Sequence, residues 1–291
     1  ADVVHSMDIA KAVGAERLRE IMAGLLDRAT AVVGRYGGTV DKFTGDGVMA
    51  IFGAPLALED HALRACRAEY DALADRSGLH FGLEVSCLRR YDLEVNHARG
   101  AEGSVYAVQE GGPEGELTLY LPPELLEELK VEYVIGGTHW PLGAAQQREA
   151  VIRSYHRQNV FLASHPLVDV VAHPWWWQGA WEQGGRYPDM PWFDDFGVVP
   201  RSMHEEFAAA AVEHGTAVEV NAHACLLNGK YPPRFRGQYR EYLAMLKERG
   251  VRLSLGSDSH GPGYSKRILE IADDLAGLGL TEADLWRPGL S

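Results

Sequence analysis

From Leu79 to the C-terminus the sequence repeats one unit, in which a short apolar segment is followed by a segment of helical length. The apolar segments are LHFGLEVSCL, VEYVIGGTHW, VDVVAHPW, TAVEVNAH and VRLSLGSDSH, and helices are expected over 123–129, 144–159, 202–214, 237–249 and 265–278. Near-continuous apolar strands that alternate with helices are typical of parallel strands covered by helices. The sequence therefore predicts an α/β fold over 79–291, either a barrel or a doubly wound sheet.

Polar side chains recur at one place in these expected strands, the C-terminal end. Parallel α/β architectures build their sites at this edge of the sheet. Most of these residues are His, Asp or Glu, the types that bind divalent metal ions. A single residue of this kind would be read as a satisfied polar group, but recurrence on successive strands indicates a shared metal site. The residues concerned are Glu84, His139, His173, Asn221, Asp258 and His260.

The Asp-Ser-His run at the last expected strand adds a second feature to this site. Residues i and i+2 of a strand point to the same face, so Asp258 and His260 are expected to reach toward one cavity. A carboxylate that bridges two cations suits hydrolysis of a phosphoester. Glu84 is another candidate for such a bridge.

Composition limits the partners and the compartment. The formal net charge is −13, so nucleic acid is not an expected partner. No apolar run reaches the ~18 residues that cross a bilayer, and no signal peptide opens the chain. Cys66, Cys87 and Cys225 show no CxxC spacing, which suits a reducing compartment. We therefore expect a cytoplasmic protein without a membrane partner.

The first 78 residues follow a different pattern. An amphipathic helix is expected over 15–36, ending at Gly37-Gly38, and a second helix over 59–76. Between them, TVDKF and VMAIFGAP flank Thr44-Gly45-Asp46-Gly47. An Asp-Gly pair between two strand-like runs predicts an antiparallel hairpin. This region is therefore expected to form an α+β segment of its own, 1–78.

The segments GLEVS, GGTHW, VVAHPW, EVNAH and SDSH, in this order and spacing, resemble the PHP (polymerase and histidinol phosphatase) family over about 79–291. The resemblance implies a distorted (β/α)7 barrel with two or three divalent transition metal ions (Zn, Mn or Fe). It also implies a phosphoesterase, in which a metal-bound hydroxide hydrolyses a small phosphorylated substrate.

The same resemblance implies roles for individual residues. Glu84 would be a bridging ligand, His139 and His173 ligands of one ion, and Asp258 with His260 the last ligand pair. Asn221 would line the substrate pocket.

The chain departs from the family at its beginning. The family opens with an HxH pair on its first strand and supplies another His after its second strand, and neither is present here. His5 and His61 are the only histidines before His80. At least one metal site would lack ligands, so the barrel is expected to be incomplete.

The N-terminal residues instead resemble a fragment of a class III nucleotide cyclase domain over about 1–68, most specifically in DKFTGDGVMAIFGAP. In that family Asp2 and Asp46 would correspond to the metal-binding aspartates and Lys42 to the residue that recognises adenine. The second half of a cyclase domain, which supplies an Asn and an Arg, is absent from this segment. Without that half, a hairpin-turn aspartate is the better-supported interpretation of Asp46.

Three functional hypotheses follow from the sequence. The first is a metal-dependent phosphoesterase, and the second a cyclase-like module that makes a cyclic nucleotide from ATP. The third is a degenerate metal-binding protein without turnover. The origin of the combined chain also stays open: a fusion of fragments, a truncated segment of a longer protein, or an unusual recombination. Residues 1–78 could also replace the missing first barrel units, although the hairpin signal argues against this.

Overall fold

A computed structural model describes residues 13–43, 48–54, 60–72, 79–99, 112–119, 121–144, 147–177, 192, 195–259 and 266–289. The chain forms two compact units. The first comprises Ala1–Phe81 and Pro123–Val131, and the second comprises Gly82–Pro122 and Glu132–Ser291.

The first unit combines helices with a two-stranded sheet. Helix α2 (Ala15–Arg35) is followed by β1 (Thr39–Phe43) and β2 (Val48–Ile51), and these strands pair antiparallel. The helix ends where the sequence predicts, because Gly37 adopts a φ of 74° and the amide of Gly38 bonds to the carbonyl of Val33. The expected antiparallel hairpin is therefore confirmed, and its turn residues 44–47 lie outside the described residues.

A small core joins α2 to two further helices, α3 (His61–Ala72) and α5 (Pro123–Leu129). Its buried residues are Val32, Tyr36, Ala68 and Leu129. The hydroxyl of Tyr36 also donates to Asp71 at 2.7 Å. Segment 123–131 thus packs in the first unit, although it lies within the 79–291 range of the sequence-based division.

The second unit is built on a six-stranded sheet in the order β4-β3-β5-β6-β7-β8. Five of its strands are parallel, and β4 runs antiparallel to β3. The strands are β3 (Gly82–Arg89), β4 (Leu117–Leu119), β5 (Tyr133–Gly137), β6 (Val170–Ala172), β7 (Ala217–Asn221) and β8 (Leu253–Gly256). Among the described residues β4 and β8 are the outermost strands of this sheet, and β1 and β2 contribute no strand to it. Leu253 of β8 also makes one isolated parallel bridge, with Leu285.

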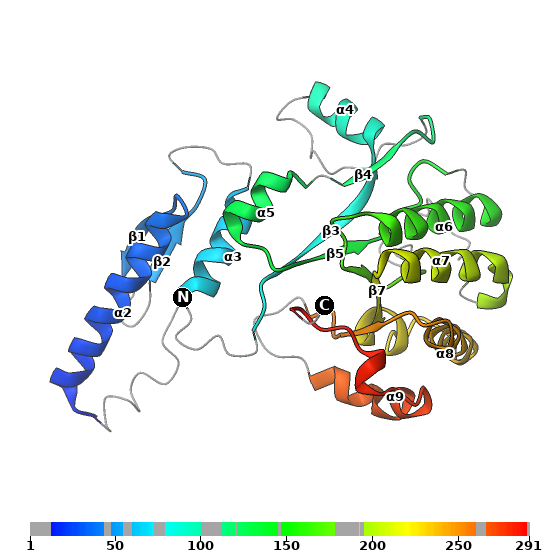
Figure 1. Ribbon diagram of the computed structural model, residues 1–291. Coiled ribbons are helices and arrows are strands. Elements are labelled where there is room, and N and C mark those ends of the chain that lie inside the picture. The colour runs from blue at the N-terminus through cyan, green and yellow to red at the C-terminus, as the bar shows by residue number, and fades with distance from the viewer. Residues whose placement is uncertain are drawn as a thin grey trace. The chain divides into compact units, whose positions relative to one another are not determined.

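Helices flank this sheet, as the alternating pattern predicts. Helices α6 (Arg148–Ser164), α7 (Arg201–His214) and α8 (Pro233–Glu248) lie one after another along it (Figure 1). Every residue of β6 and β7 is buried, which explains why these strands read as apolar runs. The α/β class expected for this part of the chain is confirmed.

Several short elements complete the second unit. They are α4 (Arg90–Arg99), η3 (Phe196–Val198), the π-helical turn η4 (Ala222–Leu226), η5 (Lys266–Ile271), α9 (Ala272–Gly277) and η6 (Glu282–Asp284). The sequence analysis predicted neither α4 nor β4. In the described part of the chain no helix has the length and apolar character needed to span a bilayer. The three cysteines are free thiols.

Candidate metal centre

Three of the residues singled out by the sequence converge at one edge of the sheet of the second unit. His139 follows β5, His173 follows β6, and Glu84 lies on β3. Parallel strands present their C-terminal ends at a common edge, which brings the residues that follow them together. Glu84 does not end its strand, because β3 continues to Arg89 and pairs there with β4. It is level with Ile135, near the end of β5.

The three side chains form a compact donor cluster. Oε1 of Glu84 lies 3.3 Å from Nε2 of His139 and 3.4 Å from Nε2 of His173. The ligand atoms all lie within 4.8 Å of one another, and the two imidazole rings are 5.0 Å apart. The His173 side chain is 4% exposed, that of His139 18% and that of Glu84 40%. The cluster is therefore anchored in the core at His173 and open to solvent at Glu84.

The electrostatics of the cluster favour an ionised carboxylate. Burial raises the pKa of Glu84, but its hydrogen bonds with His139 and His173 outweigh burial and bring the pKa well below its usual range. Burial also lowers the pKa of His139, and this effect prevails there. At His173 burial is outweighed by Glu84 and by the charge of Glu219, and the pKa rises. A divalent cation bound among these three side chains would replace the hydrogen bonds of the carboxylate with coordination bonds to the carboxylate and to the two imidazoles.

A serine on β3 fixes the orientation of one histidine. Oγ of Ser86 lies 3.0 Å from Nδ1 of His139. Ser86 is two residues beyond Glu84, so both side chains lie on the same face of the strand. A hydrogen bond at Nδ1 leaves Nε2 as the metal-facing nitrogen and holds the ring in place.

The backbone of His173 is held in an unusual conformation. Its φ is 28°, in the left-handed region that non-glycine residues rarely occupy. Its N–H donates to Oε2 of Glu219 at 2.9 Å, and its carbonyl accepts from the amide of Trp176 at 2.9 Å. Such conformations persist where the surroundings hold them, and they cluster at functional sites.

Glu219 was missed by the sequence analysis. It lies in β7, two residues before Asn221, and is buried at 8% exposure. Its Oε2 also accepts from Nδ2 of Asn221 at 3.0 Å. The signal was available, because a Glu at i−2 from Asn221 in an apolar strand shares the face of that residue.

Both the nitrogen and the oxygen of the Asn221 side-chain amide are hydrogen-bonded. Nδ2 donates to Glu219, and Oδ1 accepts from the amide of Ala224 at 2.6 Å, at the start of η4. The residue is 1% exposed. Among the described residues Asn221 therefore supports Glu219, and its contact with a substrate stays a prediction.

The last predicted ligand pair is described only in part. Asp258 follows β8, is partly exposed and adopts a φ of 52°. Its charge raises the pKa of both His139 and His173, although it is not one of the three clustered ligands. His260 lies outside the described residues. The place of this pair in the centre stays a prediction.

The residues assigned to the cyclase resemblance are not gathered into a site by the described structure. Lys42 lies on β1 and is exposed. Asp2 and Asp46 lie outside the described residues. The cyclase hypothesis therefore stays a prediction from sequence.

Aromatic residues surround the donor cluster on one side. The ring of Trp176 lies 5.9 Å from that of His139 and 5.1 Å from that of His173, and Trp140 lies 5.4 Å from His139. The neighbouring Trp175 and its contact Trp192 are fully buried and pack in the core. Trp176 and Trp140 thus form the apolar wall of the centre.

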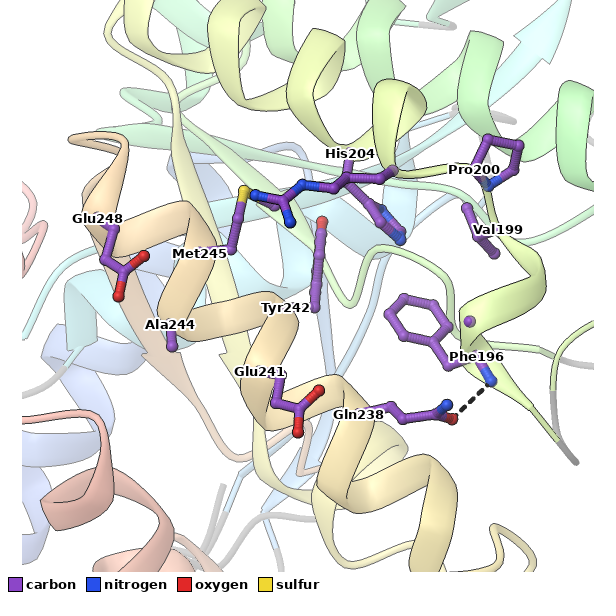
Figure 2. A pocket seen from close by; sticks show the side chains of 12 residues that line it. Phe196, Val199, Pro200, His204, Gln238, Glu241, Tyr242, Ala244, Met245 and Glu248 are labelled. Atoms are coloured by element: carbon purple, nitrogen blue, oxygen red, sulfur yellow. Dashed lines mark hydrogen bonds between the residues drawn. The ribbon is translucent and has the colours of Figure 1, made fainter.

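A separate hollow of about 570 Å³ lies between η3, α7 and α8. Figure 2 shows the rings of Phe196, His204 and Tyr242 together there, with Glu241 and Glu248 along α8. Burial lowers the pKa of His204 to about 4, so its imidazole is neutral near pH 7. None of the three clustered ligands lines this hollow, and it is distinct from the candidate metal centre.

Comparison with known proteins gives little further information. No family model matches the chain. The chain is 31% identical over 154 residues to a Mycobacterium tuberculosis (strain CDC 1551 / Oshkosh) protein named Uncharacterized protein MT1361. The match covers 48% of this chain and 27% of that relative, so the chain spans little more than a quarter of the relative's length. That name attributes no activity.

Proposed function

We propose that this chain is a metal-dependent phosphoesterase of the PHP type. The observation that carries the proposal is the carboxylate of Glu84, 3.3 Å and 3.4 Å from the facing Nε2 atoms of His139 and His173. Two imidazole nitrogens and one carboxylate oxygen are donors that Zn²⁺, Mn²⁺ and Fe²⁺ accept. The ordered sequence segments that resemble this family supply the three residues.

The three clustered donors match the ligand number of hydrolytic metal sites. Structural zinc sites are closed by four protein ligands, whereas hydrolytic sites use three and leave a position open. Here the described residues supply three ligands, and the exposed side of the cluster is at Glu84. A divalent ion bound there would supply Lewis acidity and lower the pKa of coordinated water.

Other residues of the centre would position the ligands, line the site and contribute to a second ion. Glu84 is the most exposed of the three ligands, Ser86 would orient His139, and Trp140 and Trp176 would give the site an apolar wall. Asp258, whose charge acts on both histidines, would contribute with His260 to a second ion. Two or three ions are proposed, with a small phosphorylated molecule as substrate.

The finer features of the fold and location belong to this proposal. We infer that the parallel sheet is part of an incomplete (β/α)7 barrel, since helices α6, α7 and α8 follow its strands in the order a barrel requires. Three free cysteines, two of them buried, fit a cytoplasmic location. The net charge of −13 disfavours nucleic acid as a partner.

The proposal is tested by metal analysis combined with a hydrolysis assay. We expect the purified chain to retain transition metal after dialysis and to hydrolyse p-nitrophenyl phosphate or bis(p-nitrophenyl) phosphate with Mn²⁺ or Zn²⁺ present. His139→Ala should lower the rate by at least about 100-fold, given the typical contribution of metal activation. His156→Ala is the matched control, because His156 is a largely buried histidine that pairs with the exposed Glu206 and is not one of the clustered ligands.

Two outcomes would contradict the hydrolase. Bound metal without hydrolysis of either ester would leave the degenerate metal-binding protein as the function. Conversion of ATP to a cyclic nucleotide, abolished by Lys42→Ala, would favour the cyclase-like module instead.

A further inference from the structure

We propose that Glu219 is the positioning residue of the candidate metal centre, holding His173 through its backbone N–H. This inference rests on the proposed metal site and names a residue that the resemblance did not. It is carried by the contact between Oε2 of Glu219 and the N–H of His173, at 2.9 Å.

The position of Glu219 is unusual for a carboxylate. It lies in the middle of β7, where its neighbours Val218 and Val220 are fully buried, and it is itself 8% exposed. Burying an ionisable group is costly unless hydrogen bonds satisfy it. A hydrophobic residue at this place would extend the apolar strand, so the carboxylate calls for a specific partner.

Hydrogen bonds of Glu219 join the metal centre on one side to η4 on the other. One oxygen, Oε2, accepts from the N–H of His173 and from Nδ2 of Asn221. Asn221 is anchored in turn by the amide of Ala224. Asn221, at the start of η4, therefore holds Glu219 in place, and Glu219 in turn holds the backbone of His173.

The neighbouring strand leaves space for this carboxylate. A Cβ atom added to Gly256 on β8 would lie 1.7 Å from Oε1 of Glu219. No side chain fits at position 256 without displacing the carboxylate. The missing side chain at Gly256 thus makes room for the carboxylate of Glu219. Neither residue would need this close fit if it served only the general stability of the fold.

The hydrogen bond to Glu219 restrains His173 at its backbone, which has an unusual conformation. With a φ of 28°, the backbone of His173 is in a region that L residues seldom occupy. Its N–H bonds to Glu219 and its carbonyl to Trp176, so both peptide groups beside the imidazole are fixed. Fixing them sets the direction in which Nε2 points, which is toward Glu84.

Glu219 acts through His173 rather than as a ligand. Its accepting oxygen is already used by two donors, and it is not one of the three clustered ligand atoms. Partners of this outer kind typically contribute 10- to 100-fold to metal affinity.

Cobalt titration of the full chain tests the proposal. Glu219→Ala should weaken Co²⁺ binding by roughly 10- to 100-fold, whereas the isosteric Glu219→Gln keeps an acceptor oxygen and should stay within about threefold of the wild type. Thr216→Val is the matched control, because it removes one buried hydrogen bond of the same unit, to Ala163, without touching the centre. It should leave Co²⁺ affinity and the cobalt absorption spectrum unchanged.

The outcomes separate positioning from a merely structural or ionic role. Wild-type affinity in Glu219→Ala would overturn the proposal. So would a loss in Glu219→Gln as large as in Glu219→Ala, because charge rather than hydrogen bonding would then be responsible. If Glu219→Ala does not fold, Glu219→Asp replaces it, since shortening the side chain also withdraws the oxygen from His173.

Hydrogen exchange of the His173 amide in metal-free protein distinguishes failure of this proposal from failure of the proposed function. If the wild type binds no Co²⁺, the metal centre is wrong. The His173 amide should still be protected in the wild type and in Glu219→Gln, and exchange at least about tenfold faster in Glu219→Ala. Equal exchange in all three would overturn the positioning role by itself.

Discussion

Oε1 of Glu84 lies 3.4 Å from Nε2 of His173, although β5 separates the strands that carry these residues in the sheet. His139 follows β5, the strand between them, and its Nε2 lies 3.3 Å from the same carboxylate oxygen of Glu84. One oxygen thus faces two imidazoles from successive strands. This relationship defines the candidate metal centre, and the predictions below depend on it.

Ser86→Ala should weaken metal binding without unfolding the protein. Oγ of Ser86 lies 3.0 Å from Nδ1 of His139, so its removal frees the ring to rotate. We expect a loss of about tenfold in Zn²⁺ affinity, measured by calorimetry. The control is Ser154→Ala, which removes a hydroxyl that donates to the carbonyl of Pro141. Equal affinity in both variants would show that Ser86 does not orient His139.

Gly256→Ala should destabilise the protein and weaken metal binding together. The new Cβ would lie 1.7 Å from Oε1 of Glu219, so the carboxylate or the strand must move. Overpacking of this kind costs about 1–3 kcal/mol in the free energy of unfolding, measured by urea denaturation.

Gly237→Ala should stabilise the protein rather than destabilise it. Gly237 lies within α8, and a Cβ there meets nothing within 4 Å. Alanine should stabilise the helix by about 0.5–1 kcal/mol and leave metal affinity unchanged. If Gly256→Ala were tolerated as well as Gly237→Ala, the close approach of Glu219 to β8 would be wrong.

His204 should make the protein less stable in acid. Burial lowers its pKa from 6.5 to about 4 in the folded state. Between these values the unfolded chain binds more protons than the folded chain, so stability falls as pH drops from about 6.5 toward 4 and levels off below. The full effect is on the order of 3 kcal/mol, since one pKa unit corresponds to about 1.4 kcal/mol.

Urea unfolding of the wild type and of His204→Phe at about pH 7, 5.5 and 4.5 measures this effect. Phenylalanine keeps a ring among Trp175, Phe196 and Tyr242 and removes the titrating group. The difference in stability between the two proteins should shift toward the variant as pH falls. A constant difference would mean that His204 is not buried in its neutral form.

The sequence predicted much of the fold because its signals are local. The helix expected over 202–214 is α7 (Arg201–His214), and the expected helix over 123–129 is α5 (Pro123–Leu129). The Asp-Gly pair predicted the antiparallel pairing of β1 and β2. Periodicity, caps and turns are encoded by neighbouring residues, so they can be read without knowledge of the tertiary structure.

Non-local pairing was not predicted. Strand β4 is only three residues long and exists through its pairing with Cys87, Leu88 and Arg89 of β3. Pairing with β5 carries β3 past Glu84 to Ser86, and pairing with β4 carries it on to Arg89, so Glu84 lies within its strand rather than at its end. Helix α4 follows directly, with the buried ion pair of Arg89 and Asp92 at its start. These contacts depend on segments that meet only in the folded chain.

The donor residues of the site were predicted, but their supports were not. An expected position at strand ends singled out Glu84, His139 and His173, and the structure brings their ligand atoms together, although Glu84 lies within β3. Glu219 escaped because it lies inside an apolar strand, and the partner that explains it, the N–H of His173, is a backbone group. Hydrogen bonds to backbone groups leave no residue-type pattern in a sequence, so the available signal was the spacing of Glu219 and Asn221 on one face of β7.

Metal binding by His173→Ala compared with the wild type tests the central claim most directly. The wild-type chain, stripped with chelator and titrated with Zn²⁺, should bind at least one ion tightly. His173→Ala should lose that site, with affinity lower by at least about 100-fold, because it removes one of three protein ligands. Absence of tight Zn²⁺ binding by the wild type, or an unchanged site in His173→Ala, would contradict a metal centre built on Glu84, His139 and His173.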